Sequence, residues 1–340
     1  MDHKPSILII GAGGFIGGFI AKAALERSYD TWVGVRRSTS REYLADERLH
    51  FITFDYDDKG AIAAALKENA PSDGKWQHII WNLGATKCAN FQNFNLINYQ
   101  YLRNFVEVLI DEDMVPERFL FMSSLSALGT YDDVNYTKAT SHTIPQPNTR
   151  YGLSKIKAET FLEMQSGFPW IIFRPTGVYG PHEKDYLMMI ESIDRHFDFG
   201  VGYKRQVLTF IYVEDLVNAM FDALKAGVVH KKYIISEPRS YTQKEFRDMV
   251  SRKLGRKLVI PLKLPLPVVY VASYVAEKWA AARLKASTLN RDKFKIMKQR
   301  NWDCDVSDAQ QDFGFTVRYP LSAGLDATIK AYLDSKNKSK

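Results

Sequence analysis

Cysteine is scarce in this sequence, and long hydrophobic runs are missing. The 340 residues include only two cysteines, Cys88 and Cys304, which are far apart, so we expect neither a disulfide framework nor a cysteine-based metal site. No apolar run reaches the roughly 18 residues of a membrane-spanning helix, and the opening residues, MDHKPS, contain no apolar core of a secretory signal. These absences predict a cytoplasmic protein without stable membrane insertion.

Patterns that bind metals or nucleic acids are also missing. The seven histidines show no ligand spacing, so we predict no metal site. The formal net charge is +7, but lysine and arginine are spread along the chain, which argues against a nucleic-acid partner. The one dense basic run, residues 336–340, is predicted to be a flexible tail. We expect a small-molecule substrate, and a chain that is a monomer or a homodimer.

Glycine is concentrated near the start of the chain, between an apolar run and a helical pattern. Residues 7–10 predict a buried parallel strand, and the apolar spacing over 15–25 predicts a helix. Between them Gly11 allows a tight turn, Gly14 lets the backbone approach a pyrophosphate, and Gly17 lets the helix pack closely on the sheet. The free N–H groups at the start of this helix would then bind the phosphates of a dinucleotide.

The rest of the first half alternates strands and helices. Strands are predicted over 31–35, 49–54, 78–84, 118–124 and 170–175, with helices over 59–70, 98–113 and 151–165. This alternation predicts an α/β fold with a doubly wound parallel sheet. After Pro175 helices dominate, as over 242–255 and 265–284. We expect a dinucleotide-binding domain of residues 1–176 plus about 208–236, and a smaller, mostly helical C-terminal substrate-binding cap of 177–207 plus about 237–335.

Residues suited to proton transfer lie on two consecutive predicted elements. Tyr151 and Lys155 are four positions apart on a predicted helix, so they share one face. Because a nearby ammonium favours a phenolate, we predict that the pKa of Tyr151 is lowered and that this phenol exchanges a proton with a substrate oxygen. Ser123 and Ser124 end the preceding strand at the carboxyl edge of the sheet, where a hydroxyl could donate to the same oxygen.

An acidic residue is missing just beyond the second predicted strand. About 20 residues after the glycine turn, NAD-binding folds carry an Asp or Glu, whereas this chain has Arg36 and Arg37. An acid would repel a 2′-phosphate, and a guanidinium can clamp one through two parallel hydrogen bonds. We therefore predict that NADP(H) is preferred over NAD(H), and that Arg36 contacts the phosphate.

Taken in this order, the motifs resemble those of the extended short-chain dehydrogenases/reductases, of the NAD-dependent epimerase/dehydratase type. The resemblance covers nearly the whole chain and includes residues 11–17, 82–86, 123–129, 174–181, 210–220 and 303–315. It implies a Rossmann-type fold. The apolar segment 254–286 is closest in character to the 3β-hydroxysteroid dehydrogenase and dihydroflavonol reductase branch.

The resemblance also implies roles for individual residues. Asn98 stands where the family has an active-site asparagine, and the distance to Gly129 selects Ser124 over Ser123 as the catalytic hydroxyl. With Tyr151 and Lys155 these residues form the predicted catalytic set. The predicted cofactor-binding residues are Gly11, Gly14, Phe15, Ile16, Gly17, Arg36, Asp55, Tyr56, Leu83, Gly84, Tyr151, Lys155, Pro175 and Val178.

The reaction implied is hydride transfer between a nicotinamide and a carbonyl or alcohol substrate, with Tyr151 as the proton donor or acceptor. A sugar or sugar-nucleotide epimerase is one alternative, but Gly177 and Leu208 stand where those enzymes have an asparagine and an arginine that would contact a diphosphate. A non-catalytic NADP-binding sensor is a second alternative, against which the intact Ser124, Tyr151 and Lys155 argue.

The apolar stretch 261–285 allows two interpretations. Its helix could line a pocket for a hydrophobic substrate, or it could touch a membrane surface. Because the charges Glu277, Lys278 and Arg283 are few and not one-sided, we expect this helix to pack on its own domain rather than on a membrane.

Overall fold

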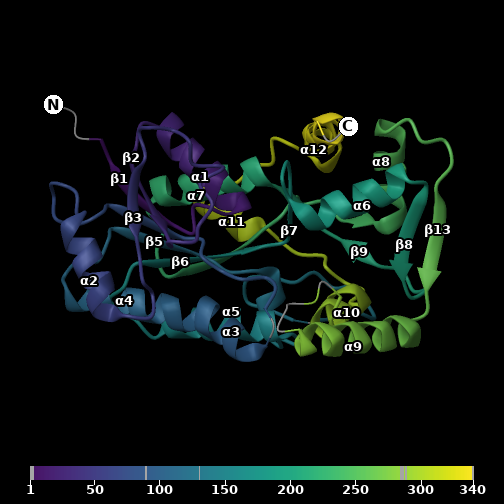
Figure 1. Ribbon diagram of the computed structural model, residues 1–340, viewed down its shortest axis with the longest axis horizontal. Helices are drawn as coiled ribbons and strands as arrows, with labels where there is room; N and C mark the ends of the chain where they lie inside the picture. The colour runs from purple at the N-terminus through teal and green to yellow at the C-terminus, as the bar shows by residue number, and fades with distance from the viewer. Residues whose placement is uncertain (1–3, 89, 130, 284–286, 288, 339–340) are drawn as a thin grey trace.

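A seven-stranded parallel sheet forms the centre of the computed structural model, which describes residues 4–338 except 89, 130, 284–286 and 288 (Figure 1). In order across the sheet the strands are β11 (Lys231–Ile235), β6 (Trp170–Pro175), β5 (Arg118–Met122), β4 (His78–Trp81), β1 (Ser6–Ile10), β2 (Asp30–Val35) and β3 (His50–Thr53). The strand order reverses between β1 and β4, which is the switch point where open α/β sheets bind ligands. The predicted doubly wound sheet is confirmed.

Helices cover both faces of the sheet. α1 (Phe15–Glu26), α7 (Val213–Ala226) and α11 (Ser307–Phe313) pack on one face, and α2 (Lys59–Glu68), α4 (Tyr101–Asp111) and α5 (Arg150–Glu163) pack on the other. Alternation along β1 explains the two layers, because Ile7 and Ile9 join the first core while Leu8 and Ile10 join the second. All four side chains are fully buried, as a strand between two helical layers requires.

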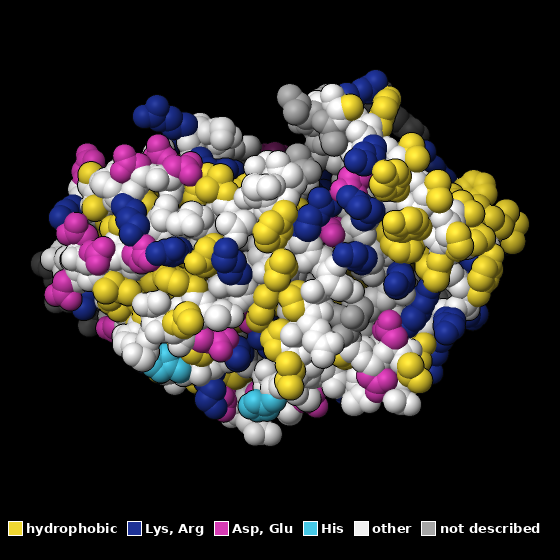
Figure 2. All heavy atoms as spheres, turned by 90° about the horizontal axis from the view of Figure 1, so that it is seen from below, with side chains coloured by type: hydrophobic (Ala, Val, Ile, Leu, Met, Phe, Trp, Pro, Cys, Tyr) yellow, Lys and Arg dark blue, Asp and Glu magenta, His cyan; other side chains and the backbone are white. Residues whose placement is uncertain are grey.

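A second group of elements lies beyond the carboxyl ends of the strands. It comprises β7 (Gly177–Tyr179), α6 (Lys184–Asp194), β8 (Phe197–Val201), β9 (Val207–Leu208), β10 (Phe210–Tyr212), β12 (Tyr241–Thr242), α8 (Gln243–Lys253), β13 (Ile260–Leu264), α9 (Leu266–Ala282), α10 (Arg291–Lys298) and α12 (Leu321–Lys338). Much of it shares a core of its own, separate from the two sheet cores. Hydrophobic side chains remain on the surface over α9 and β13, at the upper right of Figure 2.

Several local expectations need correction. The helix predicted over 98–113 begins earlier, with α3 (Phe91–Asn95) and the π-helical turn η1 (Leu96–Gln100), and continues as α4 to Asp111. Strand β11 was not predicted, and the cap carries short strand pairs besides its helices. Residues 336–338, predicted as a flexible tail, continue α12, because the Lys336 ammonium binds the buried carboxylate of Asp194 at 2.6 Å. The proposed domain boundaries stay a prediction.

Candidate active site

A cavity of about 1080 Å³ opens at the switch point of the sheet. Its walls come from the segments that follow β1, β2, β4, β5 and β6, and from the cap elements α6, β8 and α10. One end is therefore built by the sheet edge and the other by the cap. The two ends differ in composition, and we describe them in turn.

The glycine turn after β1 packs closely at two of its glycines and leaves open space at a third. A Cβ on Gly11 would lie 2.6 Å from the Leu83 nitrogen, and one on Gly17 would lie 2.3 Å from the Gly11 oxygen, so both glycines serve close packing. A Cβ on Gly14 would meet only the Gly11 oxygen, at 3.7 Å. Gly14 is the N-cap of α1 without a side-chain cap, and the first turn holds no acid. The exposed N–H groups and the open space suit the phosphates of a dinucleotide.

The loop after β2 adds a cationic side chain and hydroxyls to this end. Arg36, Ser38, Thr39 and Ser40 all line the cavity. The Arg36 N–H donates to the Thr39 hydroxyl at 2.9 Å, which holds the loop in a tight turn. In the part of the chain that the structure describes, no carboxylate forms an ion pair with the exposed Arg36 guanidinium. That guanidinium remains available to a phosphate.

Ser123 and Ser124 separate into two different environments at the end of β5. The Ser123 hydroxyl donates to Glu159, which also forms a buried ion pair with Arg174 at 2.5 Å. Ser124 caps the short 3₁₀ turn η2 (Leu125–Ala127), and its oxygen accepts from the Ser126 N–H at 3.2 Å. Both line the cavity, but the Ser123 hydroxyl is bound to Glu159, whereas the Ser124 hydroxyl is in contact with Tyr151.

Tyr151 lies in the first turn of α5, where the Thr149 side chain caps the helix by accepting from the Gly152 N–H. Burial raises the pKa of Tyr151 to about 12, and a hydrogen bond with Ser124 opposes that rise only in part. Our prediction of a lowered pKa is therefore wrong for the protein chain itself. The contact with Ser124 does place the two hydroxyls together, as predicted.

Lys155 lies one turn along α5 from Tyr151 and is almost fully buried. Its ammonium donates to the Met122 carbonyl at 2.7 Å and lies 4.9 Å from the centre of the Phe121 ring. Burial lowers the pKa of Lys155 to about 8, and the charge of Glu159 opposes this shift. The burial of Tyr151 itself, rather than the charge of Lys155, therefore dominates the pKa of this phenol.

Asn98 lies behind the cavity wall rather than in it. Its side-chain oxygen accepts from the Ala85 N–H at 2.7 Å, and its amide donates to the Ala85 carbonyl and to the Ser154 hydroxyl. It therefore ties the segment after β4 to α5. A Cβ on Gly84 would lie 2.9 Å from the Lys155 nitrogen and 3.3 Å from the Asn98 oxygen. Close packing of Lys155 and Asn98 thus requires glycine at position 84.

Most of the predicted site residues line one cavity. From the cofactor set these are Gly11, Gly14, Phe15, Ile16, Arg36, Tyr56, Leu83, Gly84, Tyr151, Lys155, Pro175 and Val178. Gly17, Asp55 and Asn98 do not line it. Gly17 packs against the turn, and the exposed Asp55 accepts from the Asp57 N–H at 3.2 Å instead of facing the cavity.

The cap end of the cavity is mostly apolar and was not predicted residue by residue. Its lining side chains include Phe94, Tyr186, Met188, Phe199, Met297 and Trp302. No short motif identifies these side chains, because they come from separate segments that are spread over more than 200 residues of the chain. The cations Lys87 and Lys293 at this end both bind Asp185, at 2.7 and 3.0 Å. The two cations thus share one carboxylate.

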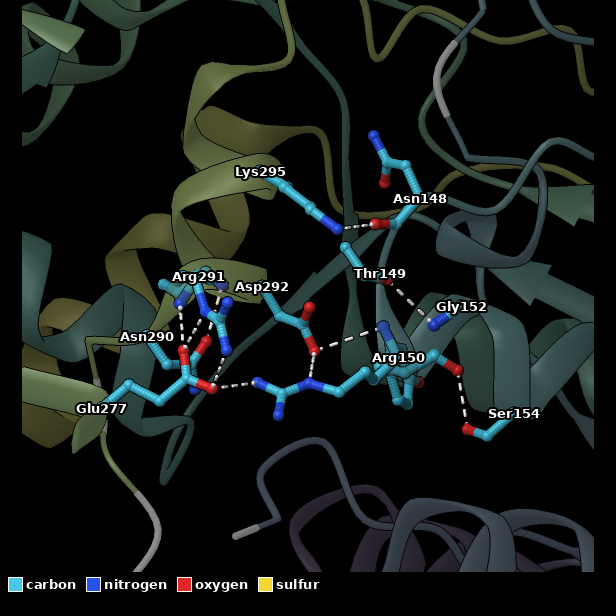
Figure 3. Close-up of polar contacts among 12 residues, drawn as sticks. Asn148, Thr149, Arg150, Gly152, Ser154, Glu277, Asn290, Arg291, Asp292 and Lys295 are labelled. Atoms are coloured by element: carbon cyan, nitrogen blue, oxygen red, sulfur yellow. Dashed lines mark hydrogen bonds and ion pairs between the residues drawn. The ribbon is translucent and has the colours of Figure 1, made fainter. Parts of the chain in front are cut away.

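A charge network joins the helix of Tyr151 to the cap (Figure 3). The Arg150 guanidinium donates to Asp292 at 2.8 Å and to Glu277 at 3.0 Å. Glu277, on α9, also accepts from Arg291 at 3.0 Å, and these cations lower the pKa of Glu277 to about 2. The residue immediately before Tyr151 thus fixes the start of α5 against α9 and α10.

Comparison with known proteins matches residues 7–236 to the model of the NAD dependent epimerase/dehydratase family. The chain belongs to this family. Its order of glycine turn, Ser124 and Tyr151-x-x-x-Lys155 is also that of the extended short-chain dehydrogenases/reductases, as predicted. Members of the family use NAD or NADP, and the glycine turn fits the phosphates of either cofactor.

Relatives within the family act in different ways. A ceramide reductase from Caulobacter vibrioides is 22% identical over 97% of this chain and 95% of its own. A UDP-glucose 4-epimerase from Vibrio cholerae is 23% identical over 99% of both chains. The structure of DesIV, a dTDP-glucose 4,6-dehydratase from Streptomyces venezuelae with NAD and TYD bound, superposes with a TM-score of 0.77 at 18% identity, covering 98% of both chains. At this identity the superposition shows the shared fold alone.

Proposed function

We propose that the protein is an NADP(H)-dependent oxidoreductase that interconverts a carbonyl and an alcohol on an apolar substrate. The observation that carries this proposal is the single cavity, which joins Ser124, Tyr151 and Lys155 at one end to an apolar wall at the other. The only cations at the apolar end are already paired with Asp185 among the described residues. A substrate without a diphosphate suits such a wall.

The proton chemistry follows from the positions of three side chains. A bound cofactor would give or take hydride at the substrate carbon. Tyr151 remains protonated at neutral pH because its pKa is raised to about 12, so it can donate a proton to the substrate oxygen. Ser124, whose hydroxyl contacts Tyr151, would orient that oxygen, and Lys155 would bind the ribose of the nicotinamide. Asn98 would hold α5 at the correct distance.

Two further observations support the choice of cofactor and substrate. Arg36 has no carboxylate partner in the described ranges and borders the cavity, which favours the 2′-phosphate of NADP(H). The relative named ceramide reductase spans nearly the whole chain, and a ceramide is a lipid with long apolar chains. The apolar chain of a lipid would fill the apolar end of the cavity, with its carbonyl at Tyr151.

An epimerase acting on a sugar nucleotide is the second candidate, favoured by the match to a UDP-glucose 4-epimerase over 99% of both chains. Gly177 argues against it. A Cβ at this position would lie 1.8 Å from the Tyr186 hydroxyl, so the asparagine expected in such epimerases has no space here. Leu208 likewise lines the cavity where an arginine would be needed.

Turnover of the purified protein separates the candidates. NADPH oxidation is followed with ketones that carry apolar chains and, in parallel, UDP-sugars are tested for conversion with NAD. We expect NADPH loss with the ketones and no conversion of the UDP-sugars. Conversion of a UDP-sugar without net formation of NADH would establish the epimerase. Tight cofactor binding with no turnover of either class would favour the sensor.

A further inference from the structure

Helix α9 and strand β13 carry hydrophobic side chains that no described residue covers. We define the apolar patch as Phe199 of β8, Leu262 and Leu264 of β13, and Val271, Val275 and Trp279 of α9. The three α9 side chains are 58–62% exposed. Of the described α9 residues only Val269 and Ser273 are buried, so the helix uses a narrow stripe for its own packing.

Our expectation that this helix packs on its own domain accounts for its buried stripe, but not for its exposed apolar side chains. All five residues of β13 are exposed, although its sequence, IPLKL, is mostly apolar. Contiguous apolar surface of this kind is uncommon on proteins that stay in water and marks an interaction site. No described helix is long and apolar enough to cross a bilayer, so a membrane could be contacted only at its surface.

The charges around the apolar patch are almost all positive. Residues 256–283 contain five basic side chains, of which Arg256 is paired with Asp194, and one acid, Glu277, which Arg150 and Arg291 neutralise. Lys278 and Arg283 lie over the rings of Tyr274 and Trp279, at 5.8 and 3.6 Å from the ring centres. Figure 2 shows Lys and Arg side chains bordering the hydrophobic area over α9 and β13. Exposed cations beside aromatic and aliphatic side chains match an anionic lipid surface.

We propose that the apolar patch docks on the surface of an anionic lipid bilayer, from which the cavity takes its substrate. The second part rests on the proposed function. Phe199 belongs to the apolar patch and also lines the cavity, so a lipid carbonyl could pass from the bilayer to the active site along one continuous apolar surface. A second copy of this chain is a poorer occupant, because a two-fold contact would place the same cations opposite each other.

Vesicle flotation tests the docking without any turnover. The protein is mixed with phosphatidylcholine vesicles, with or without phosphatidylglycerol, and the bound fraction is measured. We expect binding to the anionic vesicles, reduced about tenfold or more by Val271→Ser with Val275→Ser, since both side chains lose apolar burial. The matched control is Ile110→Ser with Met164→Ser, which removes exposed apolar groups on α4 and after α5 and should leave binding unchanged.

Charge substitutions and a measurement of the oligomeric state can contradict the docking. Lys278→Gln with Arg283→Gln should weaken binding to the anionic vesicles by roughly fivefold for each charge removed, and added salt should do the same. Absence of wild-type binding, or equal binding to both vesicle types, would overturn the docking. So would a dimer in light scattering that the two valine substitutions dissociate. NADPH turnover of a short, water-soluble ketone without vesicles tests the proposed function separately, since it needs no docking.

Discussion

The two ends of the cavity are lined by different kinds of chemical groups. The sheet end is made by backbone turns and short polar side chains, and its key contacts, such as Lys155 to the Met122 carbonyl, lie inside the fold. The cap end is made by large apolar side chains from separate segments, and its two lysines, Lys87 and Lys293, share the carboxylate of Asp185. The first end can perform one kind of chemistry, whereas the second determines which molecule receives it.

The relatives include a reductase, an epimerase and a dehydratase, so a shared fold supports several reactions. A change at the sheet end alters the reaction for every substrate, while a change at the cap end alters only the choice of substrate. The charge network of Arg150, Glu277 and Asp292 connects the two ends next to Tyr151. The following experiments test the division from its largest expected effect to its smallest.

Tyr151→Phe should remove turnover with every carbonyl substrate and leave cofactor binding nearly unchanged. In the proposed function the phenol supplies the proton at the sheet end, and general acid catalysis contributes about 10²–10⁴-fold, so a loss of that size is expected. Steady-state rates on several ketones and cofactor titration by fluorescence measure both quantities. A Phe variant with a rate near that of the wild type would refute the assignment of Tyr151.

Arg36→Ala should reduce the preference for NADPH over NADH by about one to two orders of magnitude. A hydrogen bond to a charged group contributes about 1.5–3 kcal/mol, and this one would be made only with the 2′-phosphate. Arg37→Ala is the matched control, because Arg37 is equally exposed but does not line the cavity. Equal wild-type affinities for the two cofactors would show that Arg36 serves another purpose.

The sequence predicts the sheet end far better than the cap end, for a physical reason. Gly11, Gly14 and Gly17 act within a few residues of one another, so spacing alone reveals the turn. Phe94, Tyr186 and Trp302 meet only through the tertiary fold, and each could equally be an ordinary core residue. The raised pKa of Tyr151 was missed because spacing gives the neighbour of a side chain but not its burial.

Gly14→Ala and Gly17→Ala form a pair that separates ligand space from packing space. Alanine at 14 meets no atom closer than 3.7 Å, so stability should be unchanged or raised by about 0.4–1 kcal/mol, while cofactor affinity should fall roughly tenfold. Alanine at 17 meets backbone at 2.3 Å and should destabilise the protein by about 1–3 kcal/mol. Thermal unfolding and cofactor titration compare the two variants. Unchanged affinity in the Gly14 variant would contradict the pyrophosphate site.

The smallest effect concerns the buried ammonium of Lys155. Its pKa is lowered to about 8, against 10.5 for an ordinary lysine, so between these values the unfolded chain holds a proton that the folded protein has lost. The free energy of unfolding should therefore rise with pH in this window. Below the window Lys155 is protonated in both states, and the folded protein bears the full cost of burying the ammonium charge. Relative to Lys155→Met, the wild type should gain about 1 kcal/mol between about pH 7 and about pH 9. Urea unfolding at several pH values measures the difference, in which the other titrating groups cancel. If the free energies of unfolding of the two proteins changed with pH in parallel, Lys155 would keep an ordinary pKa. Water would then reach its ammonium at the sheet end of the cavity.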